Sequence, residues 1–431
     1  MLIRIRALTP IWTGDINGKC TKLRETSILG SLRWWFETIV RGLDGYACDS
    51  IGELTKKCEL DYKKYKTGKD PKELICPVCY IFGTTRWNRR FKLEISNNNT
   101  EKIKRSIIVK VREDKNHKGW FLGKDDSGGV LGEFTISIRE IYGECKDLVA
   151  LLLHLASLWG IGAKTQDGFG ICEFNGDYDF DKAISQIKSL KYNNSKDNNP
   201  ILPNLEDFFF AKIVIKEDVE DKIKNSLSKR LYEKVKENGK YKDKQISIND
   251  FLRYIPRNYK GQFYPTAPLI RDWLRGLFRN GNDDLRHFLF GFVSIKGRPT
   301  PICKEHLIHT IRENDKYKCK KCNKILKKEE YFEKMGSKIF VSHIYRLNDD
   351  KWEFKIWGYI LKILPHDAQR EEILKKLYTE ITDEKSFADI LGLDKDQINV
   401  TWYEISEDRS DIAINSTESL IKAILEVRLN E

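Results

Sequence analysis

Cysteine and histidine residues form two clusters whose spacing suits a metal ion. Cys76 and Cys79 stand in a C-x-x-C pair, and Cys48 and Cys58 precede them in the same polar stretch. Four thiolates can close a tetrahedral zinc site. We therefore predict a structural zinc that folds residues 44–79, a segment too polar to fold alone. Unligated thiols and a redox C-x-x-C pair are the alternatives.

The second cluster has the spacing of a zinc ribbon. Cys303 and His306 form one knuckle, and Cys319 and Cys322 form the other. His309 is an alternative ligand to His306. Because each cluster supplies four protein ligands and leaves no position for water, we expect both zinc sites to be structural rather than catalytic.

Arginine residues interleaved with aromatic residues predict contacts with a nucleic acid. Arginine offers a forked donor to phosphate, and tryptophan can stack on an unpaired base. The net charge of +12 and the pI near 9.0 also favour a polyanionic partner. The alternative for each candidate arginine or lysine is a solvated surface position, and the alternative for tryptophan is a position in the core. The candidates are Arg33, Arg41, Arg86, Trp87, Arg89, Arg90, Arg271, Arg275, Arg279, Lys296 and Arg298.

The segment "GIGAKTQDGFG", residues 160–170, follows the most apolar helical stretch of the chain. One glycine would satisfy a helix C-cap, whereas four suggest close approach of a partner's backbone. A simple turn and a phosphate-contacting loop are both open at this point. The candidate RNA contacts in the loop are Gly162, Lys164, Thr165, Gln166, Gly168 and Phe169.

Enzyme signatures are absent from the sequence. It contains no Walker A loop, no H-E-x-x-H motif and no evident acid/base pair, so we expect no catalytic residue. The longest apolar run, residues 148–163, is too short to span a bilayer, and the N-terminus lacks the apolar core of a signal peptide. We therefore expect a cytoplasmic protein without membrane contact.

The elements that must position these residues alternate between strands and helices. In the first half we predict strands at 2–8, 90–96, 106–113 and 132–140, helices at 27–43 and about 146–159, and a closing strand from 171. The order β-α-β-β-α-β is typical of a ferredoxin-like, RRM-type domain. The Asn-rich stretch 189–204 is predicted to be a linker.

The second half repeats this beginning. A strand at 207–217 precedes a charged helix at about 218–238, and "LIRDWLRGLF" then echoes "SILGSLRWWF" of the first half. A hairpin around 348–350 and helices at about 366–379 and 416–428 follow. We predict an α+β fold of two tandem ferredoxin-like domains, residues 1–188 and 205–431. The Cys-rich insertion lies at about 44–79 and the zinc-ribbon-like insertion at about 301–330.

Five motifs together resemble the RAMP superfamily of CRISPR proteins, and within it the first-numbered RAMP subunits of the Cmr (type III-B) effector complex. They are "LTPIWTGD" (8–15), "SILGSLRWWF" (27–36), "IFGTTRWNRRFKLEI" (81–95), "GIGAKTQDGFG" (160–170) and "KGRPTP" (296–301). The resemblance implies two ferredoxin-like domains and identifies 160–170 as the family's glycine-rich, RNA-facing loop.

The resemblance also implies a function: a non-catalytic subunit that contacts the 3′ part of CRISPR RNA, the single-stranded target RNA, or both, beside other Cmr subunits in antiviral defence. Two other classes remain open. One is a metal-independent CRISPR-RNA processing endoribonuclease, with His343 or His154 and Lys164 as its candidate groups. The other is a zinc-ribbon transcription factor, which would prefer duplex DNA; RRM-like strands favour single strands instead.

Overall fold

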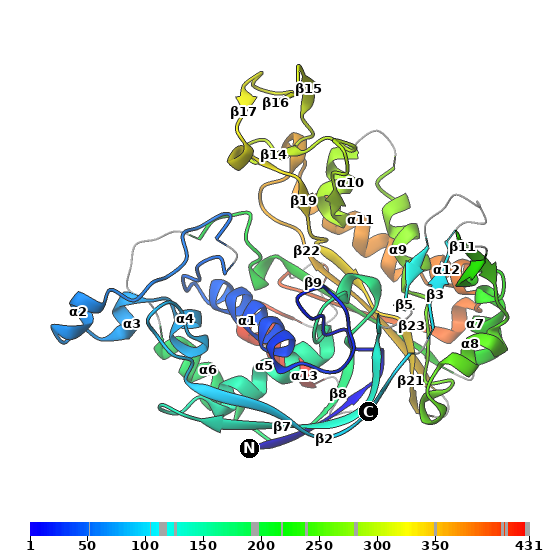
Figure 1. Ribbon diagram of the computed structural model, residues 1–431, viewed down its shortest axis with the longest axis horizontal. Helices are drawn as coiled ribbons and strands as arrows, with labels where there is room; N and C mark the ends of the chain where they lie inside the picture. The colour runs from blue at the N-terminus through cyan, green and yellow to red at the C-terminus, as the bar shows by residue number, and fades with distance from the viewer. Residues whose placement is uncertain are drawn as a thin grey trace.

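The computed structural model describes residues 1–50, 52–103, 105–111, 119–124, 127–190, 198–216, 219–237, 240–279, 283–348, 351–406, 409 and 413–426. Helices and antiparallel sheets alternate along these residues (Figure 1), which confirms the α+β class. Among the described helices, none is long and apolar enough to cross a membrane.

The first sheet is antiparallel and has the strand order β2-β7-β1-β8. Its strands are β1 (Leu2–Ala7), β2 (Phe91–Lys102), β7 (Val130–Glu140) and β8 (Cys172–Asn175). In β1, buried Ile3, Ile5 and Ala7 alternate with more exposed residues, so one face of the strand packs on the core. Helices α1 (Glu25–Gly42) and α5 (Lys146–Trp159) agree with the predicted helices at 27–43 and 146–159.

The second sheet repeats this arrangement. Strand β9 (Phe208–Lys216) lies between β22 (Lys351–Tyr359) and β23 (Ile398–Glu404), as β1 lies between β7 and β8. Strands β21 (Ile344–Asn348) and β22 form the predicted hairpin, whose turn residues 349–350 lie outside the described residues. The short strands β12 (Phe263–Tyr264) and β20 (Ile339–Val341) complete this sheet.

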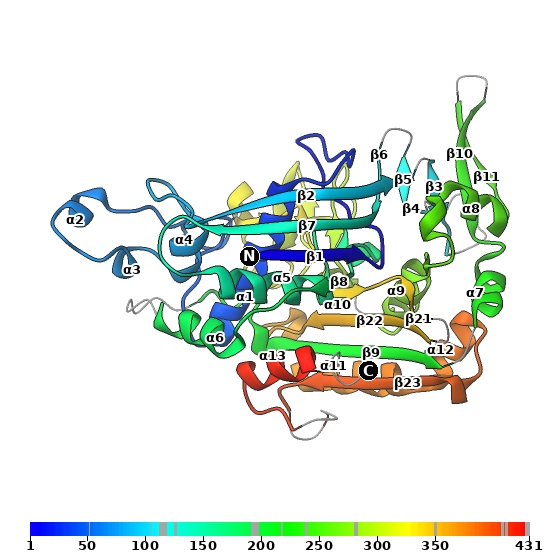
Figure 2. The same ribbon diagram turned by 90° about the horizontal axis from the view of Figure 1, so that it is seen from below.

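Helices α1 and α5 connect the two sheets. The ring of Trp159, at the end of α5, stacks on Phe210 of β9 with centroids 4.5 Å apart. Trp35 of α1 contacts Phe208 of the same strand at 5.7 Å. The two sheets therefore lie one above the other and share a continuous core (Figure 2).

A third sheet combines strands from both sides of the predicted linker. Its order is β11-β10-β3-β4, with β3 (Ile107–Val109), β4 (Trp120–Phe121), β10 (Leu231–Glu237) and β11 (Lys240–Gln245). The predicted helix at 218–238 is therefore wrong beyond α7 (Glu220–Leu227), because the following residues pair as strands. The predicted strand at 106–113 is confirmed only as β3, and residues 112–113 lie outside the described part.

The remaining elements surround this framework. The Cys-rich insertion contains α2 (Tyr62–Lys66), α3 (Pro71–Leu74) and α4 (Pro77–Phe82). The segment after residue 310 folds into a projecting ribbon of β15 (Ile311–Glu313), β16 (Lys316–Lys318) and β17 (Ile325–Leu326), at the top of Figure 1. The other helices are α6 (Phe180–Ser189), α8 (Ile248–Tyr254), α9 (Ala267–Gly276), α10 (Asp283–Phe290), α11 (Arg370–Thr382), α12 (Glu384–Leu391) and α13 (Thr417–Glu426). The other strands are β5 (Gly123–Lys124), β6 (Ser127–Gly128), β13 (Phe292–Val293), β14 (Ile302–Cys303), β18 (Tyr331–Phe332) and β19 (Lys334–Met335).

Candidate nucleic-acid interface and metal centres

A cleft of about 1000 Å³ lies between the two halves of the chain. One wall comes from α1 and the glycine loop 160–170, and the other from α9, β13, β19 and the segment that reaches Phe340. The two helices that carry the internal echo, α1 and α9, therefore face the same space. This cleft brings together predicted RNA contacts that are more than a hundred residues apart in the sequence.

The glycine loop owes its glycines to the protein's own packing. Gly160, Gly162, Gly168 and Gly170 all have positive φ values, between 88° and 119°. A Cβ atom on Gly162 would overlap the carbonyl oxygen of Trp12, and one on Gly168 would lie 2.6 Å from Nδ1 of His343. The fold itself therefore accounts for the four glycines, and the approach of an RNA backbone to this loop stays a prediction. These contacts hold the loop against segments of both halves.

The middle of the loop nevertheless faces the cleft. Thr165, Gln166 and Asp167 form a short 3-10 helix, and all three line the cleft. Lys164, which precedes them, places its ammonium group 3.4 Å from the ring centroid of Trp12. The loop thus presents polar side chains to the cleft beside Gly160 and Gly162, which also line it.

The opposite wall carries two of the predicted arginines. Arg271 and Arg275, one turn apart on α9, both line the cleft. Arg271 is only 3% exposed and donates to the carbonyl oxygens of Ile339 and Phe290. Burial lowers the pKa of Arg271 to about 10 and, although Arg271 opposes the change, raises the pKa of the nearby Asp167 to about 6. Both groups are therefore predominantly ionised at neutral pH.

Aromatic side chains from several elements complete the cleft. The lining includes Trp34 of α1, Trp120 of β4, Phe340 of β20 and Tyr359 of β22. Trp34 is half-buried and packs edge-on against Trp35, with centroids 4.7 Å apart. The guanidinium of Arg271 lies 5.5 Å from the Trp120 ring centroid. Such rings beside arginines can stack on unpaired bases while the arginines contact phosphates.

The first Cys cluster is a candidate metal centre. Ligand atoms of Cys48, Cys58, Cys76 and Cys79 all lie within 4.8 Å of one another. The sulfur of Cys48 lies 3.5 Å from that of Cys79 and 3.8 Å from that of Cys76. Zinc–sulfur bonds of about 2.3 Å in a tetrahedron require sulfur–sulfur distances of about 3.8 Å. The donor set and its dimensions fit zinc.

Hydrogen bonds link the four thiols of this centre to one another and to Arg33. The bonds among the thiols lower the pKa of Cys48 well below its ordinary value and raise the pKa values of Cys58, Cys76 and Cys79 above theirs, so Cys48 is the thiol that ionises first. Arg33 donates to the sulfur of Cys79 at 3.2 Å and to the carbonyl oxygen of Gly83 at 2.9 Å. A cation that donates to a ligand sulfur favours the thiolate that a metal requires. Arg33 therefore belongs to the surroundings of the metal centre.

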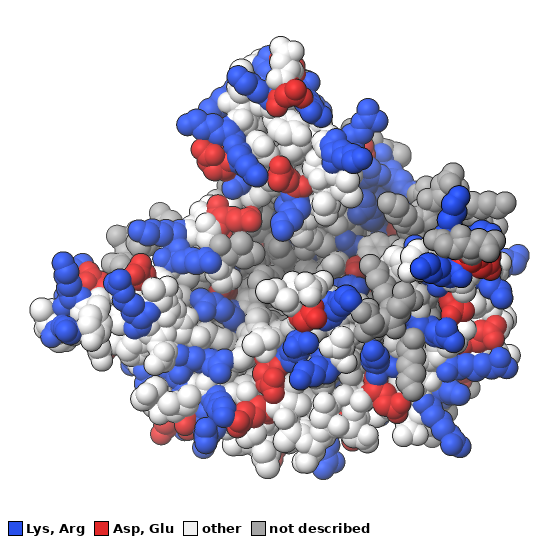
Figure 3. All heavy atoms as spheres, in the orientation of Figure 1, with Lys and Arg blue, Asp and Glu red and all other residues white. Residues whose placement is uncertain are grey.

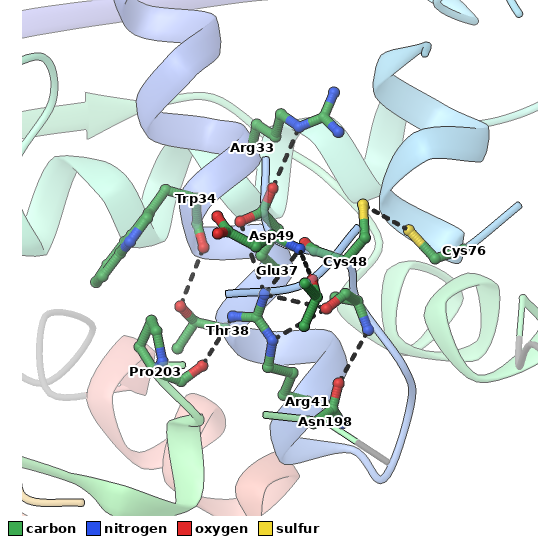
Figure 4. A network of polar contacts seen from close by, with 12 residues as sticks. Arg33, Trp34, Glu37, Thr38, Arg41, Cys48, Asp49, Cys76, Asn198 and Pro203 are labelled. Atoms are coloured by element: carbon green, nitrogen blue, oxygen red, sulfur yellow. Dashed lines mark hydrogen bonds and ion pairs between the residues drawn. The ribbon is translucent and has the colours of Figure 1, made fainter. Parts of the chain in front are cut away.

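Arg41 has a structural position too. It is 2% exposed and donates to the carbonyl oxygens of Ala47, Cys48 and Pro203 (Figure 4). These bonds tie the end of α1 to the start of the Cys-rich insertion and to the segment before β9. The predicted contact of Arg41 with RNA is therefore corrected, because its guanidinium is enclosed by carbonyl groups.

The second cluster lies at the base of the projecting ribbon. Nδ1 of His306 is 3.8 Å from the sulfur of Cys303 and 3.4 Å from that of Cys319. Cys322 is exposed and groups with His306 and Glu305. The four predicted ligands thus gather around His306, but they do not form one closed set. The alternative ligand His309 points both ring nitrogens elsewhere, toward His287 and the carbonyl oxygen of Thr300.

The Arg-rich turn after the first metal centre lies outside the cleft lining. Trp87 stacks on Tyr80 with ring centroids 5.6 Å apart, and the guanidinium of Arg90 lies 4.4 Å from the Tyr80 ring centroid. Arg89 donates to the carbonyl oxygen of Phe91, and Arg86 pairs with Glu59 at 3.3 Å. These contacts fix the turn; its RNA contact stays a prediction.

The other basic candidates lie on exposed surface. Arg279 pairs with Asp272 at 2.8 Å, and Lys296 and Arg298 are exposed on the loop before the ribbon. Figure 3 shows Lys and Arg spread widely over one face, including the projecting ribbon, rather than gathered in one patch. Charge alone therefore does not locate a binding surface on this face.

The burial of Gly168 and Phe169 corrects their assignment as RNA contacts. Phe169 is 1% exposed, and its ring packs edge-on against Trp12 at 5.8 Å. Gly168 is buried and accepts a hydrogen bond from the backbone N–H of His343. Both residues join the loop to the core.

The two histidines considered for catalysis occupy packed positions. His343 is 0% exposed, and burial lowers its pKa to about 3, so it is neutral. Its Nδ1 accepts from the backbone N–H of Ala267 at 3.3 Å. His154 stacks on Phe174 with centroids 4.3 Å apart and bonds the hydroxyl of Tyr178.

Sequence reasoning did not identify Asp167, Trp120 or Phe340 as site residues. Asp167 stands in a loop chosen for its donors, and Trp120 and Phe340 belong to short strands of weak periodicity. Only the tertiary arrangement brings them to one cleft. The echo between α1 and α9 was the one available signal, because it relates the two helices that form its walls.

Comparison with known proteins agrees with the first half of this description. The model of the RAMP superfamily matches residues 4–173, which include most of the first sheet, α1, α5 and the glycine loop. The match supports the resemblance to RAMP proteins that the sequence motifs indicated. No curated protein matches the chain.

Proposed function

We propose that this protein is a non-catalytic RNA-binding subunit of a CRISPR effector complex and that single-stranded RNA lies in the cleft between its halves. The observation that carries the proposal is the convergence of the glycine loop, Arg271 and Arg275 with several aromatic rings in one cleft of about 1000 Å³. The RAMP match over residues 4–173 supports a CRISPR-associated role. Phosphate-binding cations beside stacking rings are typical of single-strand binding.

The finer assignment is to the first-numbered RAMP subunit of a Cmr (type III-B) complex, in contact with the 3′ part of CRISPR RNA or with target RNA. The repeated sheet order supports two ferredoxin-like domains, since β1 and β9 each lie between the equivalents of the third and fourth strands. The two Cys clusters support structural zinc. Co-purification from the native host, with sequencing of bound RNA, tests this assignment; isolation without Cmr subunits or CRISPR RNA contradicts it.

The absence of catalysis is part of the proposal. His343 is enclosed and neutral, and His154 is engaged with Tyr178 and Phe174, so neither is presented to an RNA 2′-hydroxyl. We expect repeat RNA to remain intact when it is incubated with the protein without metal. Specific cleavage under these conditions would favour the endoribonuclease alternative.

Binding itself is tested with variants of the cleft. Arg275→Ala should weaken binding of single-stranded RNA and reduce the log–log salt slope by roughly 0.7, because one phosphate contact is lost. Arg253→Ala is the matched control: Arg253 lies on α8, outside the cleft lining, and its side chain is 74% exposed. Equal slopes for the wild type and both variants would place RNA elsewhere.

A further inference from the structure

An acidic side chain stands among the basic and aromatic residues of the cleft. Asp167 lines the cleft within the glycine loop, and its carboxylate accepts no hydrogen bond from the described residues. Burial raises the pKa of Asp167 to about 6. An acid in such a position opposes phosphate binding and is costly to desolvate. Its position therefore calls for a ligand group other than phosphate.

A guanidinium lies on the facing helix. Arg271 is the first electrostatic neighbour of Asp167. Its Nη1 and Nη2 donate to the carbonyl oxygens of Ile339 and Phe290 and its Nε is buried, so it offsets the charge of Asp167 rather than donating to a ligand. The Trp120 ring lies 5.5 Å from this guanidinium. Two acceptor oxygens, a buried cation that offsets their charge and an aromatic ring therefore share one part of the cleft.

This combination complements the edge of one base. The Watson–Crick edge of guanine presents an acceptor, O6, beside two donors, N1–H and N2–H. A carboxylate can accept from both donors at once. Adenine and cytosine each offer only one amino donor beside an acceptor, and uracil offers one donor between two acceptors. Unpaired bases in RNA are commonly read in this way, with stacking on aromatic rings.

We propose that the cleft selects an unpaired guanine of single-stranded RNA, with the carboxylate of Asp167 accepting from N1–H and N2–H of its Watson–Crick edge. The inference rests on the proposed RNA-binding function and gives it a base preference. The volume of about 1000 Å³ leaves space beyond one base for the adjoining nucleotides, which favours RNA over a free nucleotide. Arg275 remains available for phosphate at the same wall.

The first experiment compares short RNAs of about nine nucleotides, uridine throughout except for G, A, C or U at the centre, by fluorescence anisotropy. The wild type should bind the G-containing RNA about tenfold more tightly than the A-containing RNA. Asp167→Asn should reduce this ratio to about twofold or less. Asp181→Asn, the same change on an exposed acid of α6 outside the cleft lining, should leave it unaltered. A thermal melt confirms that each variant is folded.

A second measurement needs no variant. Inosine, which lacks the N2 amino group, should bind more weakly than guanosine at the central position, whereas 7-deazaguanosine keeps the whole Watson–Crick edge and should bind equally well. Equal binding of all four central bases, or an unchanged preference in Asp167→Asn, overturns the base assignment while RNA binding stands. Failure to bind any RNA overturns the proposed function as well. Tight binding of free GMP, equal to that of the G-containing RNA, overturns the assignment to RNA.

Discussion

The half-buried carboxylate of Asp167 should make stability depend on pH in a direction opposite to that of most paired acids. Its ordinary pKa is 3.8, and burial raises the folded-state value to about 6. The folded protein therefore binds this proton more tightly than the unfolded chain does. Stability from this group is fully present below about pH 3.8 and is lost as pH rises through about 6.

The size of the effect follows from the two pKa values. Between about pH 5 and about pH 7.5, a carboxyl with values of 3.8 unfolded and about 6 folded removes about 1.4 kcal/mol from the free energy of unfolding. With an unfolding entropy of about 2.1 cal/mol/K for each of 431 residues, this corresponds to about 1.5 °C in melting temperature. Asparagine at position 167 removes this contribution.

Differential scanning fluorimetry of the wild type and Asp167→Asn across this pH range measures the effect. The melting temperature of the variant minus that of the wild type should become more positive by about 1.5 °C between about pH 5 and about pH 7.5. Glu37 and Asp207, whose pKa values burial also raises, to about 7 and about 6, are present in both proteins and cancel. A difference that is constant with pH, or that changes in the opposite direction, refutes the reasoning. Asp181→Asn serves again as the control for the change of charge.

Other perturbations test the metal centres, the loop and the aromatic wall. Protein purified without added zinc should contain about two equivalents of zinc by metal analysis, and folded protein without metal would contradict both sites. Cys76→Ser should lower the zinc content by about one equivalent and reduce the melting temperature, because a structural site contributes folding free energy. Gly168→Ala should be destabilising, since a Cβ there would lie 2.6 Å from Nδ1 of His343 at φ +100°, and an unchanged melt would contradict the packing of the loop. Trp34→Ala should weaken RNA binding by roughly 1–3 kcal/mol with little change in salt slope if a base stacks there; an altered slope with unaltered affinity would argue against stacking.

Local periodicity was enough to predict much of the fold. The apolar stripe of α1 and the continuous apolar run of α5 predicted the bounds of both helices closely. The alternation in β1 and β7 likewise predicted the central strands of the first sheet. The sheet that joins β3 to β10 was not predictable in this way, because its pairing is decided by tertiary contact and its strands are short or strongly charged.

The candidate site was predictable only in part. Cysteine spacing correctly predicted that Cys48, Cys58, Cys76 and Cys79 cluster. The C-x-x-C spacing of Cys76 and Cys79 is typical of two ligands of one metal ion, and this made the cluster recognisable. Charge was a weaker guide: among the predicted phosphate contacts, Arg33 donates to a ligand sulfur and Arg41 to carbonyl oxygens. An arginine can satisfy a buried carbonyl or thiolate as well as a phosphate, and residue type alone does not separate these roles.

The glycine loop links the fold to the cleft. Gly162 packs against Trp12 of the first half, whereas Gly168 packs against His343 and Ala267 of the second, so the loop is held by both walls of the cleft at once. Its cleft-facing residues, Thr165 to Asp167, therefore have a fixed position relative to Arg271 and Arg275. Binding costs less conformational entropy when the contacting groups are already in place. For this reason a glycine substitution that impairs RNA binding would report on the packing of the loop, and substitution of the side chains that line the cleft is the sharper test of recognition.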